Sequence, residues 1–169
     1  FYFLENDYLE LAKLAQLAER NCYSDPSTTL SKLRILTEKL AKLLIAIEQL
    51  EDTYDNKQVN RLGILANKAN VPAEIISFFH TIRKSGNKAS HDGTGTQAEA
   101  RFMLRQTFYL TKWFVEVYEE IDVAHDFVTP HEAWFTADDG KTEILEKQLE
   151  LLKDKVKVYE EKAASLQIN

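Results

Sequence analysis

The sequence has little of what turns, disulfide bonds and membrane spans require. Of 169 residues, five are glycine and three are proline, too few for the frequent turns of an all-β chain. The single cysteine, Cys22, can form neither an internal disulfide nor a cysteine zinc site, and it has no activating base near it, so we expect a small buried side chain. No apolar run approaches the roughly 18 residues of a membrane-spanning helix. These absences favour a helical, cytoplasmic protein that does not enter membranes.

The chain also lacks an initiator methionine, and it ends within a helical pattern, so we expect it to be a piece of a longer protein. Its length suits one domain of ordinary size plus an appended element. The 27 acidic and 21 basic residues give a net charge of −6, which argues against a domain that binds DNA or membranes over its whole surface. A local basic patch remains compatible with that average.

Apolar residues recur at steps of three and four along residues 1–121, and this spacing predicts five helices. The expected starts are Asn6 or Asp7, Asp25-Pro26, Gln58, Pro72, and Thr96 with capping-box spacing to Glu99. The fourth helix should end near Gly93, and the fifth should run to about Ile121. The predicted fold is an all-α antiparallel bundle.

Residues 122–140 show no sustained periodicity, so we expect either a linker or a segment draped over the bundle by Phe127, Trp134 and Phe135. In residues 141–169, apolar side chains follow alternating steps of four and three, which is typical of a coiled coil. The predicted seam is Leu145, Leu149, Leu152, Val156, Tyr159, Ala163 and Leu166. Self-association through this helix is one expectation, and a final bundle helix packed on the domain is the alternative.

A polar cluster lies in the second half of the expected fourth helix. Arg83, Asn87 and His91 are four residues apart, so a continuous helix places them on one face. Gly86 costs about 1 kcal/mol in a helix interior, which predicts that another backbone or a large side chain comes close to it. Two interpretations stay open: a functional site, or a structural network that ties Arg83 and His91 to Glu38 or another acid of the second helix.

The pattern Ile82-Arg83-x-x-Gly86-Asn87-x-Ala89-x-His91, with Trp113-Phe114 downstream, resembles the N-terminal helical domain of type I restriction-enzyme restriction subunits and related helicases. The resemblance covers roughly residues 1–120 and includes the first two helices, through Phe3-Leu4, the run from Leu11 to Glu19, Asp25-Pro26, and Leu33-Arg34 with Glu38. That domain family is grouped with the HEPN helical bundles. Some HEPN bundles are metal-independent ribonucleases that use an arginine and a histidine on one helix.

The resemblance implies a parent protein that translocates and cleaves DNA with ATP and Mg²⁺, in complex with methylation and specificity subunits. This piece would be a non-catalytic assembly or DNA-positioning domain with no cofactor or metal of its own. Its polar cluster would comprise Arg34, Glu38, Arg83, Asn87 and His91. The sequence holds no Gly-x-x-x-x-Gly-Lys-Ser/Thr loop. The other histidines lack metal-ligand spacing and are expected at the surface or the core edge, namely His80, His125 and His131.

One departure from the ribonuclease pattern limits what the resemblance implies. In that pattern the arginine precedes the histidine by four to six residues and has a polar neighbour, whereas here Gly86 stands beside Asn87 at that position. Glu160-Glu161-Lys162 has the spacing of a nuclease motif but falls in the heptad helix. Two alternatives therefore stay open: a HEPN-type ribonuclease that uses Arg83, Asn87 and His91, and a purely structural dimerisation module.

Overall fold

The computed structural model describes residues 1–135 and 148–158, and the regular secondary structure of these residues is entirely helical. The elements are a 3-10 helix η1 (Tyr2–Leu4), α1 (Leu9–Asn21), α2 (Pro26–Ile47), α3 (Gln58–Lys68), α4 (Ala73–Asp92), α5 (Gln97–Tyr118), a 3-10 helix η2 (Glu132–Trp134), and a helical segment at 148–158. None of the helices in this part of the chain is long and apolar enough to cross a membrane. The expected all-helical class is confirmed for the described residues.

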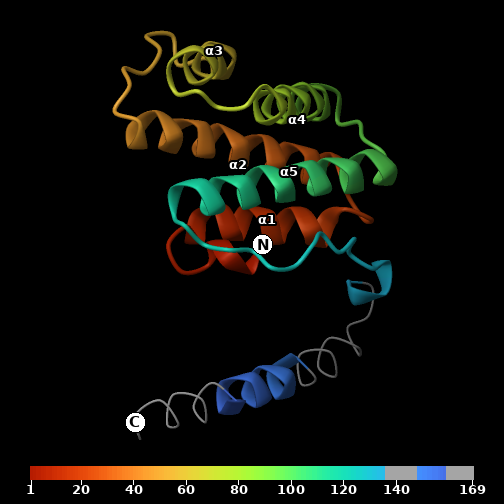
Figure 1. Ribbon diagram of the computed structural model, residues 1–169. Coiled ribbons are helices and arrows are strands. Elements are labelled where there is room, and N and C mark those ends of the chain that lie inside the picture. Colours follow the sequence, from red (N-terminus) through yellow and green to blue (C-terminus); the bar gives the residue numbers. More distant parts are fainter. Residues whose placement is uncertain (136–147, 159–169) are drawn as a thin grey trace, which may run out of the picture. The chain divides into compact units, whose positions relative to one another are not determined.

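The chain divides into two compact units, Phe1–Thr129 and Pro130–Asn169. Within the first unit, α2 is the central helix and contacts α1, α3, α4 and α5 (Figure 1). Its inward side chains are fully buried, and they include Leu33, Leu36, Leu40 and Leu44. Each buried leucine contributes roughly 2 kcal/mol of hydrophobic stabilisation, so α2 organises the core to which the other helices add one face each.

Local capping explains where α2 begins. The Asp25 carboxylate accepts a hydrogen bond of 3.1 Å from the backbone N–H of Thr28, and Pro26 occupies the first helical position. The start predicted for α2 is therefore confirmed. The start predicted for α1 is wrong, because the helix begins after Tyr8 and neither Asn6 nor Asp7 caps it. The tight turn after η1 uses these residues, and the Tyr8 N–H is satisfied by the Leu4 carbonyl at 2.8 Å.

The start of α5 forms half of the predicted capping box. The Thr96 hydroxyl accepts from the Glu99 backbone N–H at 3.1 Å. The Glu99 carboxylate does not return to the Thr96 backbone, because it accepts a hydrogen bond of 2.5 Å from the Ser85 hydroxyl on α4. This bond joins α4 to α5. The helix ends at Tyr118, somewhat before the expected end near Ile121.

Left-handed residues close several helices. Gly93 ends α4 with φ +63°, as predicted. After α2, Gln49 adopts φ +53°, and the Leu50 N–H bonds to the Ile45 carbonyl in the pattern of a Schellman motif. Other non-glycine residues with positive φ are Asn56, Asn70 and Glu120. The chain thus turns at its helix ends largely without glycine.

The segment after α5 packs on the bundle as far as Thr129. Val123 is buried, and the Phe127 ring lies 5.6 Å from that of Phe108. The Tyr109 hydroxyl donates to Asp126 at 2.5 Å. The expectation of a draped segment is confirmed for Phe127, and the first compact unit extends past the end of α5.

The rest of the predicted linker and tail is described in part. The Trp134 ring has its closest aromatic neighbours in His131 and Phe135, both in its own short segment. Of the predicted seam, Leu149, Leu152 and Val156 lie on the helical segment 148–158 and are each at least half exposed. The other seam residues lie outside the described residues, namely Leu145, Tyr159, Ala163 and Leu166. The coiled coil stays a prediction.

Candidate functional site

Helix α4 runs without interruption through the polar cluster, as the spacing predicts. Arg83, Asn87 and His91 therefore stand on successive turns of one helix face. Arg83 and Asn87 are half-buried, whereas His91 is exposed. None of the three makes a hydrogen bond or a salt bridge with any residue that the structure describes, and the Arg83 Nε is buried without a partner. The cluster is brought to one face but is not joined into a network.

Gly86 is a point of close approach between α4 and α2. A Cβ atom added to Gly86 would lie 2.5 Å from the Arg34 Cβ and 2.7 Å from the Leu30 carbonyl oxygen. Both distances are shorter than real contacts, so only glycine fits here without displacing a helix. The predicted close approach is confirmed. An arginine could not replace Gly86 in this packing, although the ribonuclease pattern places its arginine at this position.

The polar contacts between α2 and α4 are few. The Ser31 and Ser90 hydroxyls are hydrogen-bonded at 3.0 Å. Glu38 forms its salt bridge within α2, to the Arg34 guanidinium four residues earlier, at 3.0 Å. The Arg34 Nε is buried without a partner among the described residues. The partner of Glu38 is thus Arg34, and neither Arg83 nor His91 reaches this carboxylate.

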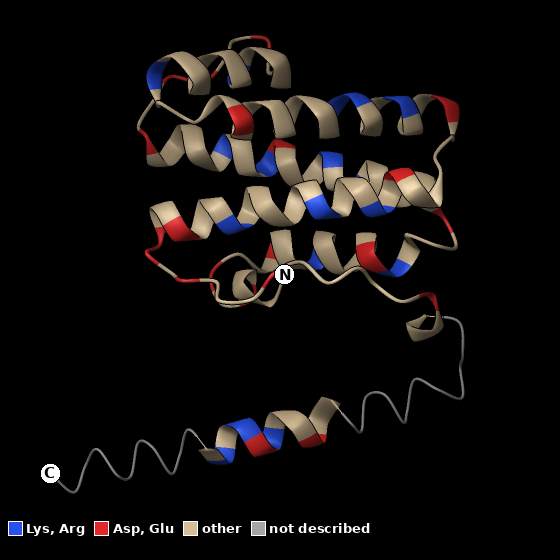
Figure 2. Ribbon diagram, turned by 45° about the vertical axis from the view of Figure 1, so that its right-hand side comes forward, with Lys and Arg blue, Asp and Glu red and all other residues tan. Residues whose placement is uncertain are grey.

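The outward face of α4 carries a longer polar row than the predicted cluster. Its side chains are spaced three or four residues apart over three turns of the helix. We call this row the basic stripe, and it comprises His80, Arg83, Lys84, Asn87, Lys88 and His91. The two acidic residues of α4 lie at the ends of the helix, Glu74 in the first turn and Asp92 in the last. Figure 2 shows the cations of α4 between these two acids. His80, Lys84 and Lys88 were not in the predicted cluster. Their spacing of three or four residues from its members already indicated that they share its helix face.

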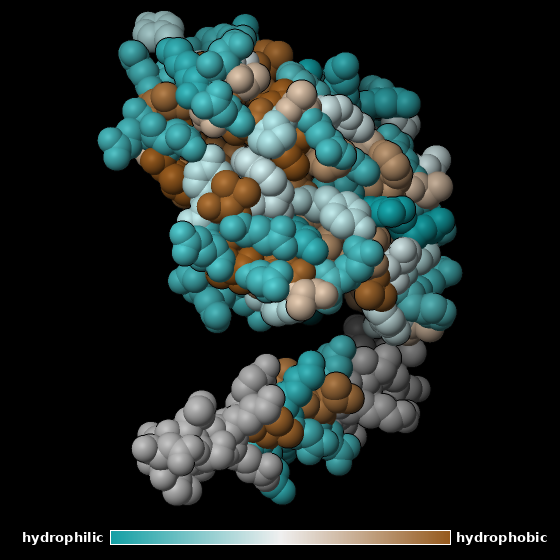
Figure 3. Space-filling view, in the orientation of Figure 1, coloured by the Kyte–Doolittle hydropathy of each residue, from teal (hydrophilic) through white to brown (hydrophobic). Residues whose placement is uncertain are grey.

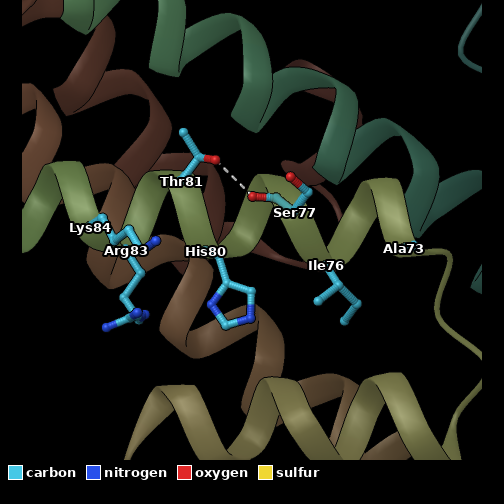
Figure 4. Close-up of a pocket in the computed structure, with 7 residues that line it drawn as sticks. All are labelled: Ala73, Ile76, Ser77, His80, Thr81, Arg83 and Lys84. Atoms are coloured by element: carbon cyan, nitrogen blue, oxygen red, sulfur yellow. Dashed lines mark hydrogen bonds between the residues drawn. The ribbon is translucent and has the colours of Figure 1, made fainter.

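A surface cleft of about 530 Å³ overlaps the first turns of the stripe. It is lined by Ala73, Ile76, Ser77, His80, Thr81, Arg83 and Lys84. In Figure 4 the His80 ring and the Arg83 guanidinium extend from α4 on the same side. Thr81 is held by its hydroxyl, which donates to the Ser77 carbonyl at 2.9 Å. The wall of the cleft is therefore apolar at Ile76 and polar at His80 and Arg83.

The stripe has a positive electrostatic environment. Burial lowers the pKa of His80 below its ordinary value of 6.5, and the nearby charges of Arg83 and Lys84 lower it further. Burial and the neighbouring cations therefore favour the neutral form of the His80 imidazole, while Arg83, Lys84 and Lys88 carry positive charge. Such a row of positive charge is suited to bind an anion.

Other candidate chemistries receive little support from the geometry. Cys22 is fully buried, as predicted. His125 stacks on the Tyr2 ring with centroids 4.8 Å apart, and burial lowers its pKa. His80 and His125 are half-buried and His131 is exposed, which agrees with their predicted places. In residues 1–135 and 148–158, no three His, Cys, Asp or Glu side chains are grouped as metal ligands.

Comparison with known proteins gives one informative match. Over 120 residues the chain is 35% identical to the type I restriction enzyme EcoKI endonuclease subunit of Escherichia coli (strain K12). The chain is related to a type I restriction endonuclease subunit. The match covers 69% of the chain but only 10% of the relative. The predicted relationship to restriction subunits is thereby supported, while the chain corresponds to a small part of such a protein.

The other comparisons add no relative. No family model matches the chain, and no solved structure matches it.

Proposed function

We propose that the chain is the N-terminal accessory and assembly domain of a type I restriction endonuclease subunit. The observation that carries this proposal is the 35% identity to such a subunit over 120 residues. The parent protein would translocate and cleave DNA with ATP and Mg²⁺, in a cytoplasmic complex with methylation and specificity subunits. The bundle would be HEPN-like, which agrees with its helical content and with the polar row on α4.

This domain would contribute binding surface and no chemistry of its own. Three features support a non-catalytic role. The position of the ribonuclease arginine is taken by Gly86 in a tight helix contact. His91 is exposed and has no hydrogen-bonded neighbour in the described part of the chain that could hold its ring in one orientation. The phosphate-binding loop of an ATP motor is absent from the sequence.

The parent reading frame tests the proposal first. Sequencing past Asn169 should reveal nuclease and helicase motifs, and a stop codon directly after this chain would contradict the proposal. The second test compares the parent protein with a variant that lacks residues 1–129, each co-expressed with methylation and specificity subunits. Loss of co-purification or of ATP-dependent DNA cleavage is expected. Complete retention of both would contradict an assembly or DNA-positioning role.

The exposed apolar side chains of the helical segment 148–158 favour a second function, self-association. Leu149, Leu152 and Val156 occupy consecutive positions of the predicted seam and are at least half exposed. Sedimentation of the chain and of a variant truncated after Gly140 measures this property. A dimer that becomes a monomer on truncation is expected. If the intact chain is a monomer and truncation leaves its thermal stability unchanged, the pairing is wrong.

A further inference from the structure

The basic stripe is a local exception in an acidic protein. The whole chain has a net charge of −6, whereas residues 75–91 contain three cations and no acid. Gly86 packs against α2, and the stripe lies beside this contact and turns away from it, with Lys84 and Lys88 exposed and Arg83 and Asn87 half-buried. A concentration of one charge on a single helix face is the electrostatic footprint of an anion-binding surface.

The cations of the stripe are also left without acidic partners. Carboxylates within 4.0 Å pair with Arg34, Lys39, Lys57, Arg61 and Lys112. Among the residues that the structure describes, no carboxylate pairs with Arg83, Lys84 or Lys88 in this way. Glu38, which belongs to the adjacent helix, is already paired with Arg34. The charge of the stripe is thus available to an external anion.

The shape of the stripe favours a regular double helix over a single strand. From His80 to His91 the row extends about 16 Å along α4, at 1.5 Å per residue. A row of this length can lie along the backbone of a duplex and meet several phosphates, whose positions the regular double helix fixes. Binding of single strands relies on stacking of bases on aromatic rings. The stripe contains no phenylalanine, tyrosine or tryptophan.

We propose that the basic stripe of α4 binds the phosphate backbone of duplex DNA without reading its sequence. Arg83, Lys84 and Lys88 neutralise phosphates, while Asn87 and His91 donate further hydrogen bonds. The choice of DNA over another duplex rests on the proposed function. Three neutralised phosphates give a salt dependence with a slope of about −2.7 in a plot of log K against log salt concentration.

The test measures fluorescence anisotropy of a labelled duplex DNA of mixed sequence, titrated with the whole chain at several salt concentrations. The variant Lys84→Gln/Lys88→Gln removes two charges from exposed positions, so the fold should be retained. Its matched control is Lys13→Gln/Arg20→Gln, which removes two charges from exposed positions on α1. Melting curves of all three proteins verify that folding is unchanged.

We expect the stripe variant to weaken DNA binding about tenfold at low salt and to reduce the salt slope by about 2, while the control changes neither. Absence of binding by the unmodified chain, or an equal loss in the control, would overturn the inference. A duplex RNA of the same sequence that binds more tightly through the same residues would overturn the assignment to DNA. The reading-frame test of the parent protein is independent of these results, so failure of the proposed function is distinguishable from failure of the stripe.

Discussion

The two faces of α4 use the same stretch of sequence in opposite ways. On the inward face, Phe79, Ile82 and Gly86 are buried and leave no room for larger groups. On the outward face, Lys84 and Lys88 are exposed and have no acidic partner in the described part of the chain. Figure 3 shows the general pattern on one side of the molecule, where hydrophilic side chains cover much of the surface and apolar ones appear between them. Neighbouring polar or small residues of one helix therefore need not share a role, because the helix turns them to different surroundings.

The largest effect is expected from the inward face. Phe79 has no exposed surface, and Phe79→Ala leaves a cavity that the rigid bundle fills only in part. We expect the free energy of unfolding to fall by about 3–5 kcal/mol, measured by urea denaturation. Lys84→Ala on the outward face serves as the control and should change it by less than about 0.5 kcal/mol. Similar losses for the two variants would remove the distinction between the faces.

Gly86→Ala tests the close approach of α4 to α2. Alanine favours a helix by about 1 kcal/mol over glycine, yet the added Cβ clashes with Arg34 and with the Leu30 carbonyl. We expect a net loss of about 1–3 kcal/mol. The control is Gly63→Ala on α3, where no atom lies within 4 Å of the added Cβ and a gain of up to about 1 kcal/mol is expected. A change of the same sign in both variants would contradict the packing described for Gly86.

Ser85→Ala removes the hydrogen bond by which α4 holds the Glu99 carboxylate. A loss of about 1 kcal/mol is expected, because Glu99 is exposed enough to regain water. Chemical denaturation of the two single variants and of the double variant Ser85→Ala/Glu99→Ala isolates the pair interaction. Strictly additive effects would show that the bond contributes nothing to the joining of α4 and α5.

His80 predicts a modest pH dependence from the outward face. Burial and the charges of Arg83 and Lys84 lower the pKa of His80 in the folded protein below 6.5. The unfolded state therefore binds more protons as the pH falls through 6.5, and stability decreases. His80→Gln should reduce the difference in stability between pH 8 and pH 5.5, measured by urea denaturation at both values. His125 is kept in both proteins, so an unchanged difference would speak against His80 as its source.

The smallest effect is expected from His91. Its side chain is exposed and has no hydrogen-bonded partner among the described residues, so His91→Ala leaves no buried group unsatisfied. Thermal denaturation should show a change below about 0.5 kcal/mol. The metal-free chain should also leave single-stranded RNA intact. Cleavage that disappears in His91→Ala at an unchanged melting temperature would instead establish the ribonuclease alternative.

Features that depend on neighbours in the sequence were predictable. Asp25 and Pro26 start α2 by local capping, and Gly93 ends α4 because glycine adopts positive φ readily. The continuation of α4 through Arg83 and His91 followed from helical spacing alone. Even the tight contact at Gly86 was indicated, since glycine inside a helix is costly unless packing requires it.

Features that depend on tertiary partners were not predictable. The Glu99 carboxylate could accept a hydrogen bond from the Thr96 backbone N–H or from a side chain of another helix. It accepts from the Ser85 hydroxyl because α4 packs close to it. Glu38 pairs with Arg34 four residues earlier on its own helix, and it was the absence of a contact to Arg83 or His91 on α4 that depended on the distance between helices. A single sequence contains no distances between helices, which is why these choices stayed open. The HEPN-like identity and the coiled coil remain predictions.

The turn after α2 makes the fold less stable than its backbone permits. Gln49 occupies a left-handed backbone conformation that costs an L-residue roughly 1 kcal/mol, and glycine is the residue that such helix ends ordinarily carry. Glu120 stands in the same conformation after α5. Packing of the buried core holds the backbone at Gln49 and Glu120 in this conformation despite its unfavourable energy. A more stable sequence for the same backbone is therefore accessible through its turns, without any change to the core or to α4.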